Sequence, residues 1–130
     1  MRKEVPEGSL CVDLGLRSIL ADDVKTSGLS RYEIAGRMGR ALSTEITKFQ
    51  LDAWTAESKE GHRFPLAYTP AWCWAVGSTR LVSHLAQVLG LRVLTDLDAA
   101  RAEVQAEREE LRQRQTELRR REAALSGKKE

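Results

Sequence analysis

Residues 29–34, LSRYEI, and residues 46–51, ITKFQL, carry the same helix-start pattern. In each stretch, a Ser or Thr side chain can accept hydrogen bonds from the free backbone N–H groups of a new helix, and a Glu or Gln three residues later can reach back. Apolar residues on either side complete a hydrophobic staple. The sequence therefore predicts two consecutive helices with a short turn between them, which is the layout of a helix-turn-helix and a reason to consider DNA.

The first of these predicted helices spans residues 31–42 and is followed by a turn at residues 43–45. One of its faces is apolar and consists of Ile34, Ala35, Met38 and Leu42. Gly36 and Gly39 lie within the helix, and each weakens it by about 1 kcal/mol relative to Ala. This cost is tolerable where close helix packing leaves no space for a side chain.

The second predicted helix, residues 47–57, has an outward face that suits DNA. The helical repeat turns one set of side chains toward the core: Leu51, Trp54, Thr55 and Ser58. The opposite face holds Phe49, Asp52, Ala53 and Ala56, and is flanked by Lys48 and Gln50. Small residues let a helix approach a major groove closely, where Gln pairs with adenine edges and Phe contacts thymine methyl groups. This face is predicted to read DNA.

Two residues of this face admit a second interpretation. Phe49 would be exposed in an isolated domain, so it either contacts DNA or packs under the N-terminal arm or against a second subunit. Asp52 opposes DNA binding unless it accepts a hydrogen bond from a cytosine amino group or from a neighbouring Lys or Arg. The surroundings of these two side chains therefore bear directly on the partner of the helix.

The loop after this helix, residues 57–67, gathers Lys59, His62 and Arg63. These side chains could contact the phosphate backbone beside the recognition helix. Such contacts would fix the register of the protein on the duplex without reading its sequence. In the other interpretation, the loop is a solvated surface segment that Phe64 anchors to the core, and His62 has no part in binding.

The remaining pattern predicts an all-α chain. An N-terminal arm (residues 1–12) precedes a compact domain of five helices at residues 13–94. Further helices are predicted at residues 13–27, 69–76 and 78–89, from apolar periodicity, from terminal glycines and from a Thr69 cap followed by proline. At least two of the three tryptophans are expected in the core, namely two of Trp54, Trp72 and Trp74. Residues 91–94 are either a strand or an extended connector, and His84 is expected to be structural.

Residues 95–126 contain no Gly, Pro or aromatic residue and are dominated by Ala, Glu, Arg, Gln and Leu. This composition predicts one helix of about 48 Å, followed by a disordered tail at residues 127–130. Five apolar residues recur every seven positions, as in a coiled coil: Leu97, Val104, Leu111, Leu118 and Leu125. We expect this helix to serve oligomerisation or partner binding.

The second core register of this predicted coiled coil is polar and consists of Arg101, Arg108, Gln115 and Glu122. A strong independent parallel dimer would not be built in this way. Weak self-association, an antiparallel pair, docking on a helix of another protein and a solvated single helix all fit the pattern.

Composition excludes several classes of protein. No apolar run approaches the roughly 20 residues that a membrane span needs, and the first residues lack the apolar stretch of a signal peptide, so a cytoplasmic protein is expected. Cys11 and Cys73 have no metal-ligand spacing and are expected to be small residues of a reduced core. No metal or cofactor is expected.

The net charge of +2 belongs entirely to the first part of the chain. Residues 1–94 hold 12 Lys or Arg against 10 Asp or Glu, and residues 95–130 hold 9 of each. One copy would therefore neutralise few phosphates, and useful DNA affinity would need well-placed contacts, several copies or both.

Three segments, SRYEIAGRM at residues 30–38, ITKFQLDAWTAES at residues 46–58 and HRFP at residues 62–65, resemble small helix-turn-helix regulators of Mu-like transposable phages and prophages. The resemblance covers roughly residues 14–94. It implies a compact helical, phage repressor-like DNA-binding domain that acts on early or lytic phage promoters. By position, the matches are Ile34, Ala35 and Gly39 in the first helix and turn, and Leu51 and Trp54 on the core side of the recognition helix. The link at residues 40–45 is longer than in such regulators.

The sequence thus predicts a sequence-specific, DNA-binding transcriptional regulator of a Mu-like phage or prophage that binds double-stranded DNA as a homo-oligomer. The predicted DNA contacts are Lys48, Phe49, Gln50, Asp52, Ala53, Lys59, His62 and Arg63. The modest charge and Asp52 favour an alternative, a protein-interaction or architectural protein on a helix-turn-helix scaffold. An enzyme is not expected, because no nucleophile–base set, phosphate-cradling glycine loop or paired metal ligands occur in the sequence.

Overall fold

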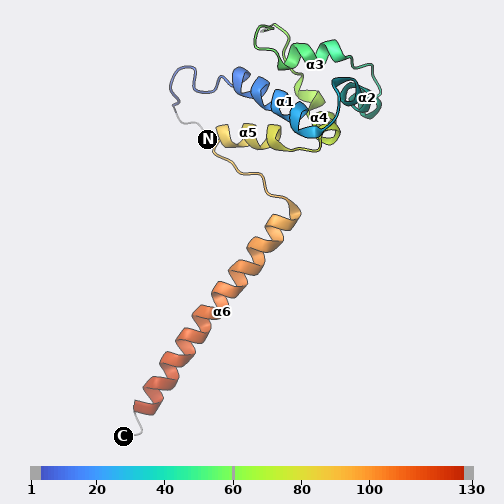
Figure 1. Ribbon diagram of the computed structural model, residues 1–130. Helices are drawn as coiled ribbons and strands as arrows, with labels where there is room; N and C mark the ends of the chain where they lie inside the picture. Colours follow the sequence, from blue (N-terminus) through green and yellow to red (C-terminus); the bar gives the residue numbers. More distant parts are fainter. Residues whose placement is uncertain (1–3, 60, 128–130) are drawn as a thin grey trace. The chain divides into compact units, whose positions relative to one another are not determined.

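The computed structural model describes residues 4–59 and 61–127, and these residues form helices, turns and loops without a β-strand (Figure 1). In chain order the elements are α1 (Asp13–Ser27), α2 (Arg31–Leu42), α3 (Lys48–Thr55), the 3-10 helix η1 (Leu66–Tyr68), α4 (Thr69–Val76), α5 (Arg80–Val88) and α6 (Asp96–Gly127). The chain divides into two compact units, one ending at Val93 and the other beginning at Leu94. The predicted all-helical chain with a long C-terminal helix is confirmed.

Both predicted capping boxes are present. The Ser30 hydroxyl accepts a hydrogen bond of 3.1 Å from the Glu33 N–H, and the Ser30 N–H donates to the Glu33 carboxylate at 3.4 Å. The Thr47 hydroxyl accepts a bond of 3.2 Å from the Gln50 N–H, and the Thr47 N–H donates to Gln50 Oε1 at 2.8 Å. These bonds satisfy the free N–H groups at the starts of α2 and α3 and fix where both helices begin.

The core of the first unit lies between α1, α2, α3, α4 and α5. Its fully buried apolar side chains are Leu20, Ile34, Met38, Leu51, Trp72 and Leu81. Trp54 is also buried, whereas 57% of Trp74 is exposed. The prediction that at least two tryptophans belong to the core is therefore confirmed.

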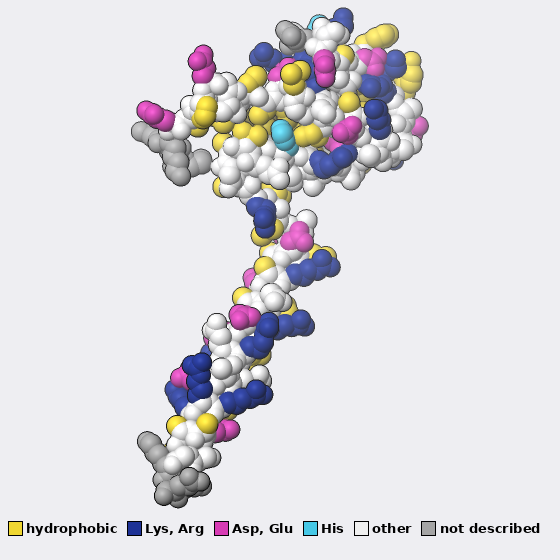
Figure 2. All heavy atoms as spheres, turned by 60° about the vertical axis from the view of Figure 1, so that its left-hand side comes forward, with side chains coloured by type: hydrophobic (Ala, Val, Ile, Leu, Met, Phe, Trp, Pro, Cys, Tyr) yellow, Lys and Arg dark blue, Asp and Glu magenta, His cyan; other side chains and the backbone are white. Residues whose placement is uncertain are grey.

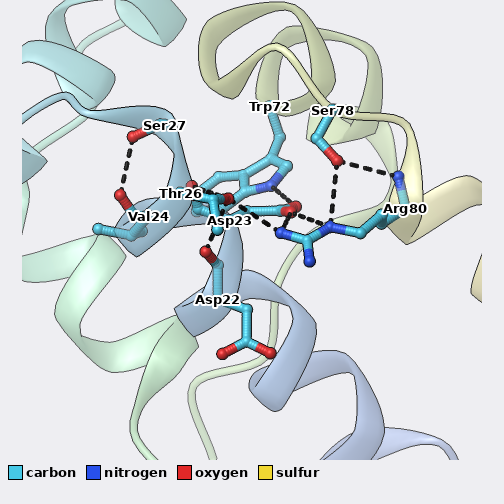
Figure 3. A network of polar contacts seen from close by, with 8 residues as sticks. All are labelled: Asp22, Asp23, Val24, Thr26, Ser27, Trp72, Ser78 and Arg80. Atoms are coloured by element: carbon cyan, nitrogen blue, oxygen red, sulfur yellow. Dashed lines mark hydrogen bonds and ion pairs between the residues drawn. The ribbon is translucent and has the colours of Figure 1, made fainter.

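A buried carboxylate joins α1 to α4 and α5 (Figure 3). Asp23 on α1 has no exposed surface. Its Oδ2 accepts a hydrogen bond of 3.1 Å from Trp72 Nε1, and its Oδ1 accepts bonds of 3.1 and 2.8 Å from Nε and Nη2 of Arg80. Arg80 Nη2 also donates to the Thr26 hydroxyl at 3.0 Å. Because a buried carboxylate is costly without donors, these bonds hold the three helices in one arrangement.

Several local expectations are corrected. α3 ends at Thr55 rather than near residue 57, so Ser58 lies in the following loop and is exposed, and Thr55 is half-buried. Cys11 is exposed rather than part of the core. Thr69 makes no side-chain cap, because α4 begins directly after the 3-10 turn η1.

The segment between α5 and α6 forms no strand, so residues 91–94 are the connector of the two alternatives. Leu91 N–H donates to the Ala86 carbonyl at 2.8 Å, and Gly90 is left-handed with a φ of 73°, which ends α5 in the manner of a Schellman motif. Residues 1–3 of the predicted arm and residues 128–130 of the predicted tail lie outside the described residues.

α6 exposes its whole length. Thr95 and Asp98 form a reciprocal cap at its start, with bonds of 3.1 and 3.3 Å. The five heptad residues are 48 to 62% exposed, and in Figure 2 hydrophobic side chains alternate with charged ones along the helix. No described helix is long and apolar enough to cross a membrane. The apolar stripe of α6 is thus left without a partner among the described residues.

The turn between α2 and α3 requires a glycine at position 39. Ser43 ends α2 in the left-handed conformation, with a φ of 52°. Thr44 N–H then donates to the Gly39 carbonyl at 3.1 Å, as in a Schellman motif. A Cβ at position 39 would lie 2.9 Å from the Thr44 carbonyl oxygen, whereas a Cβ at Gly36 would meet nothing within 4 Å. Close packing therefore explains Gly39, but the same expectation is wrong for Gly36.

We predict opposite effects of alanine at the two glycines of α2. Gly39→Ala should lower the free energy of unfolding by about 1–3 kcal/mol, because the new methyl group clashes with backbone that cannot move freely. Gly36→Ala should raise it by about 0.5–1 kcal/mol, because an exposed helical glycine gains helix propensity. Urea unfolding followed by tryptophan fluorescence measures both values. Equal stabilities of the two variants would contradict this geometry of the turn.

Candidate nucleic-acid interface

The outer face of α3 and the loop after it form a surface groove of about 480 Å³. Its lining consists of Phe49, Gln50, Asp52, Ala53, Ala56, Lys59 and His62. Phe49 is 80% exposed and makes no part of the hydrophobic core. The structure thus brings six of the eight predicted DNA contacts to one surface, and adds Ala56 from the same predicted face.

Two predicted contacts lie apart from this groove. Lys48 does not line it: its Nζ is 3.0 Å from Asp52 Oδ2 and 5.8 Å from the centre of the Tyr32 ring. Arg63 is exposed and lines a separate, mainly apolar pocket of about 280 Å³ beside Leu16 and Phe64. The grouping predicted from adjacency in sequence is therefore only partly realised, since Lys59 and His62 line the groove but Arg63 lines the other pocket.

The negative charge of Asp52 is balanced by two cations. Lys48 approaches one carboxylate oxygen at 3.0 Å, and Arg31 Nη1 of α2 approaches the other at 3.2 Å. Arg31 Nη1 also donates to the Thr55 hydroxyl at 2.8 Å. Asp52 thereby meets one of the conditions under which an acid is compatible with DNA, because neighbouring Lys and Arg side chains occupy its oxygens.

Gln50 has a structural role that constrains any part in base recognition. Its Oε1 accepts the Thr47 N–H at 2.8 Å and lies 3.4 Å from the Thr47 hydroxyl oxygen. A bidentate contact with adenine uses both the oxygen and the nitrogen of a Gln side chain. Such a contact would require Gln50 to share this oxygen or to leave the cap, whereas its amide nitrogen is not needed by the capping box.

Arg17 of α1 shapes the loop that completes the groove. The residue is 2% exposed, and its Nε donates to Asp13 at 3.1 Å. The two terminal nitrogens donate to five backbone carbonyls, at Ala53 (2.9 Å), Trp54 (3.5 Å), Ala56 (2.7 Å), Lys59 (2.8 Å) and His62 (3.2 Å). One guanidinium therefore donates hydrogen bonds to carbonyls at the end of α3 and in the loop that carries Lys59 and His62.

This contact also explains why α3 stops early. The last carbonyls of a helix lack partners within the helix and carry a partial negative charge. Arg17 supplies a cation to these groups, while Ala56 leaves the helical conformation with a ψ of 124°. Two turns follow, in which Lys59 N–H donates to Ala56 and His62 N–H donates to Lys59. The loop is therefore held by its backbone.

An aromatic cluster anchors the far end of the same loop. The Phe64 ring packs edge to face against Trp54, with ring centres 5.0 Å apart, and against Trp72 at 5.6 Å. This bears out the anchoring of the loop by Phe64, one of the two interpretations of this segment. Lys59 and His62 are exposed in the same loop, so the anchored segment still presents both side chains at the surface.

Nothing in the described part of the chain covers Phe49. Cys11 and Val12, at the end of the predicted arm, line the pocket beside Trp54 and Phe64 on another side of α3. Packing of Phe49 under the arm is therefore not observed among residues 4–59 and 61–127, whereas contact with DNA and contact with a second subunit both remain compatible with its exposure.

Sequence reasoning missed Arg17 and Asp23, although a signal for both was present. They lie on the helical stripe of α1 that includes Leu20 and Val24, at spacings of three and four residues. A charged residue on an apolar stripe is rarely buried without a partner. Apart from Asp13, four residues before Arg17, the partners lie 36 to 57 positions away along the chain, so periodicity alone could not name them.

The described residues show no sign of a metal site or a reactive thiol. No group of three or more His, Cys, Asp or Glu lies close enough to hold a metal ion within residues 4–59 and 61–127. Burial, and then the negative charge of Asp23, raise the pKa of the Cys73 thiol. A raised pKa lowers the fraction of thiolate, the nucleophilic form, so Cys73 is poorly suited to catalysis.

Comparisons with protein-family models, with curated proteins and with solved structures find no match to this chain.

We predict that the guanidinium of Arg17 cannot be replaced by another cation. Arg17→Lys keeps the charge but offers a single ammonium group, which cannot reach carbonyls at both the end of α3 and the loop. The free energy of unfolding should fall by about 2–4 kcal/mol, because buried carbonyls lose their donors. Urea unfolding measures this loss, and tryptic cleavage after Lys59 should become faster in the native protein.

The matched control is Arg37→Lys, at an exposed arginine of α2. Its stability should change by no more than about 0.5 kcal/mol. Wild-type stability and wild-type cleavage of Arg17→Lys would show that the loop does not depend on this guanidinium.

Proposed function

We propose that this chain is a sequence-specific DNA-binding transcriptional regulator, in which α2 and α3 act as a helix-turn-helix and α3 enters the major groove. The observation that carries the proposal is the groove on the outer face of α3, where an exposed aromatic ring and two alanines lie beside Lys59 and His62 of the loop.

Different side chains of the groove suit the bases and the phosphate backbone of DNA. Phe49 and Ala53 present apolar surface suited to thymine methyl groups and to close approach of the helix. Lys59 and His62 lie at the edge of this surface, where a phosphate backbone would pass. Arg17 donates hydrogen bonds to the backbone carbonyls of both residues, which supports their position beside α3.

The connection between α2 and α3 is compatible with the proposal. Its length influences the angle at which α3 would enter the major groove. Helix-turn-helix motifs join their helices by a turn of about three or four residues. Here five residues, 43–47, separate the end of α2 from the start of α3. Capping boxes at both helix starts and the Gly39 turn make this longer connection rigid.

The resemblance to regulators of Mu-like transposable phages gives the proposal its biological setting. It points to double-stranded DNA of an early or operator region as the partner, and to a role in phage or prophage transcription. We propose that several copies act together through α6, because the net charge of +2 offers one copy little attraction to phosphate.

A second candidate is a protein-interaction or architectural role of the same scaffold. Tyr32 and Phe49 are 71 and 80% exposed at the starts of α2 and α3. Exposed aromatic rings of this size are typical anchors of protein interfaces. The DNA-binding experiment separates the two candidates, since a protein interface predicts no sequence-dependent DNA binding.

We predict that Phe49→Ala combined with Lys59→Ala weakens specific DNA binding by at least about tenfold, because each lost contact is worth about 1 kcal/mol or more. The probe is a set of labelled duplex fragments from the DNA that flanks the coding sequence of the chain. An excess of unrelated duplex removes non-specific binding, and a mobility shift gives the affinity. These two side chains are chosen because Lys48 and Gln50 also support α3 and would confound the result.

The matched control replaces an exposed aromatic residue and an exposed lysine outside the groove, as Trp74→Ala with Lys25→Ala. This variant should bind DNA like the wild type, and both variants should keep the helical circular dichroism of the wild type. Specific binding that survives the loss of Phe49 and Lys59 would exclude α3 as the recognition helix. Absence of any sequence-dependent shift in the wild type would favour the protein-interaction candidate.

We further predict that removal of residues 95–130 leaves a folded first unit with weaker DNA binding. The core of this unit contains no residue of α6, so its thermal unfolding should remain cooperative. The affinity should fall by about 10²-fold, because linked copies raise the effective concentration of the second recognition helix. The same mobility shift measures the effect. Equal affinity of the truncated and full chains would exclude avidity through α6.

A further inference from the structure

We propose that α6 pairs with α6 of a second copy of this chain in the antiparallel orientation. This inference rests on the proposed self-association through α6 and adds the direction of the two helices. The observation that carries it is the uneven distribution of charge along a helix whose apolar stripe is exposed.

The stripe itself is suited to a second copy. Leu97, Val104, Leu111, Leu118 and Leu125 follow one another every seven residues and are all about half exposed. Leu111 lies at the midpoint, so the stripe has the same spacing when read from either end. An antiparallel pair that crosses at Leu111 therefore places Leu97 near the partner's Leu125, and apolar residues still meet apolar residues.

The charges of α6 distinguish its two halves. Residues 96–110 hold six acidic side chains and two arginines, a net charge of −4. Residues 111–127 hold five arginines and two glutamates, a net charge of +3. A parallel pair would set like halves side by side, whereas an antiparallel pair sets the acidic half of each copy against the basic half of the other.

Two polar positions beside the stripe disfavour a parallel pair in register. In a parallel pair in register, Arg101 would face Arg101 of the second copy, and Arg108 would face its own counterpart. Like charges at equivalent core positions are unfavourable. The antiparallel orientation removes both self-pairings but sets these two arginines against the basic half of the partner, so it is the opposition of the acidic and basic halves that favours this orientation.

The dipole of the helix does not account for this pattern. Dipole effects are confined to the first and last turns of a helix. Asp96 and Asp98 lie in the first turn, but Glu103 to Glu110 lie beyond it, and the last turn contains no basic residue. Ion pairs within the helix, such as Glu110 with Arg114 at 2.8 Å, are exposed and contribute little to its stability.

The first part of the test asks whether the full chain self-associates without DNA. Sedimentation of the wild type over a range of concentrations should show a dimer. Leu111→Asp should abolish it, because the change places a charge at the centre of the stripe. Gln113→Asp adds the same charge on the opposite face of the helix and should leave the dimer intact. A wild-type monomer would overturn both the self-association and its orientation.

The second part measures the orientation with spin labels in a full chain that also carries Cys11→Ser and Cys73→Ala. A label at Ala100→Cys lies 11 residues before the midpoint, so the two labels of an antiparallel pair are about 33 Å apart along the axis. In a parallel pair they lie at the same level. A label at Arg112→Cys, beside the midpoint, should give a short distance in either orientation and serves as the control.

A long distance at residue 100 with a short one at residue 112 supports the antiparallel pair. A dimer in which both distances are short would overturn the orientation and leave self-association through α6 standing. Because no DNA is present, failure of the proposed DNA binding would change neither measurement, and the two proposals can fail separately.

Discussion

The guanidinium of Arg17 determines the shape of the candidate interface, although its side chain is almost entirely buried. It binds the carbonyls that α3 leaves unpaired at its end, and two more in the loop that follows. An unpaired buried carbonyl costs about 1–3 kcal/mol, so several of them could not be left without a donor. The groove beside Phe49 exists because the chain turns back around this one cation.

Arg17 has a counterpart near the other end of the same helix. Asp23 accepts hydrogen bonds from Trp72 and Arg80 and so fixes α4 and α5 against α1 (Figure 3). Arg17 fixes α3 and its loop in the same way. α1 therefore organises the first unit through two buried charges of opposite sign as well as through Leu20. Non-directional apolar packing alone would allow neighbouring helices to shift, but hydrogen bonds to buried charges specify one arrangement.

The sequence predicts those features of this fold whose causes are local. The starts of α2 and α3 follow from Ser30 and Thr47, and the length of α6 follows from a composition without helix breakers. Phe49 and Ala53 fall on one face because a helix repeats every 3.6 residues. The early end of α3 and the course of the loop after it depend on distant contacts, above all those of Arg17. The periodicity of the sequence does not show which distant residues will contact each other.

Among the described residues, Arg17 donates hydrogen bonds to backbone carbonyl oxygens of the loop and to none of its side chains. Every residue type has the same carbonyl group, so the course of the loop is largely independent of which side chains stand at Lys59 and His62. The position of each residue in the loop therefore depends little on the chemistry of its side chain. A change of binding preference can arise by substitution at these sites without rebuilding the fold, which makes the loop a natural place for diversification and a practical one for engineering.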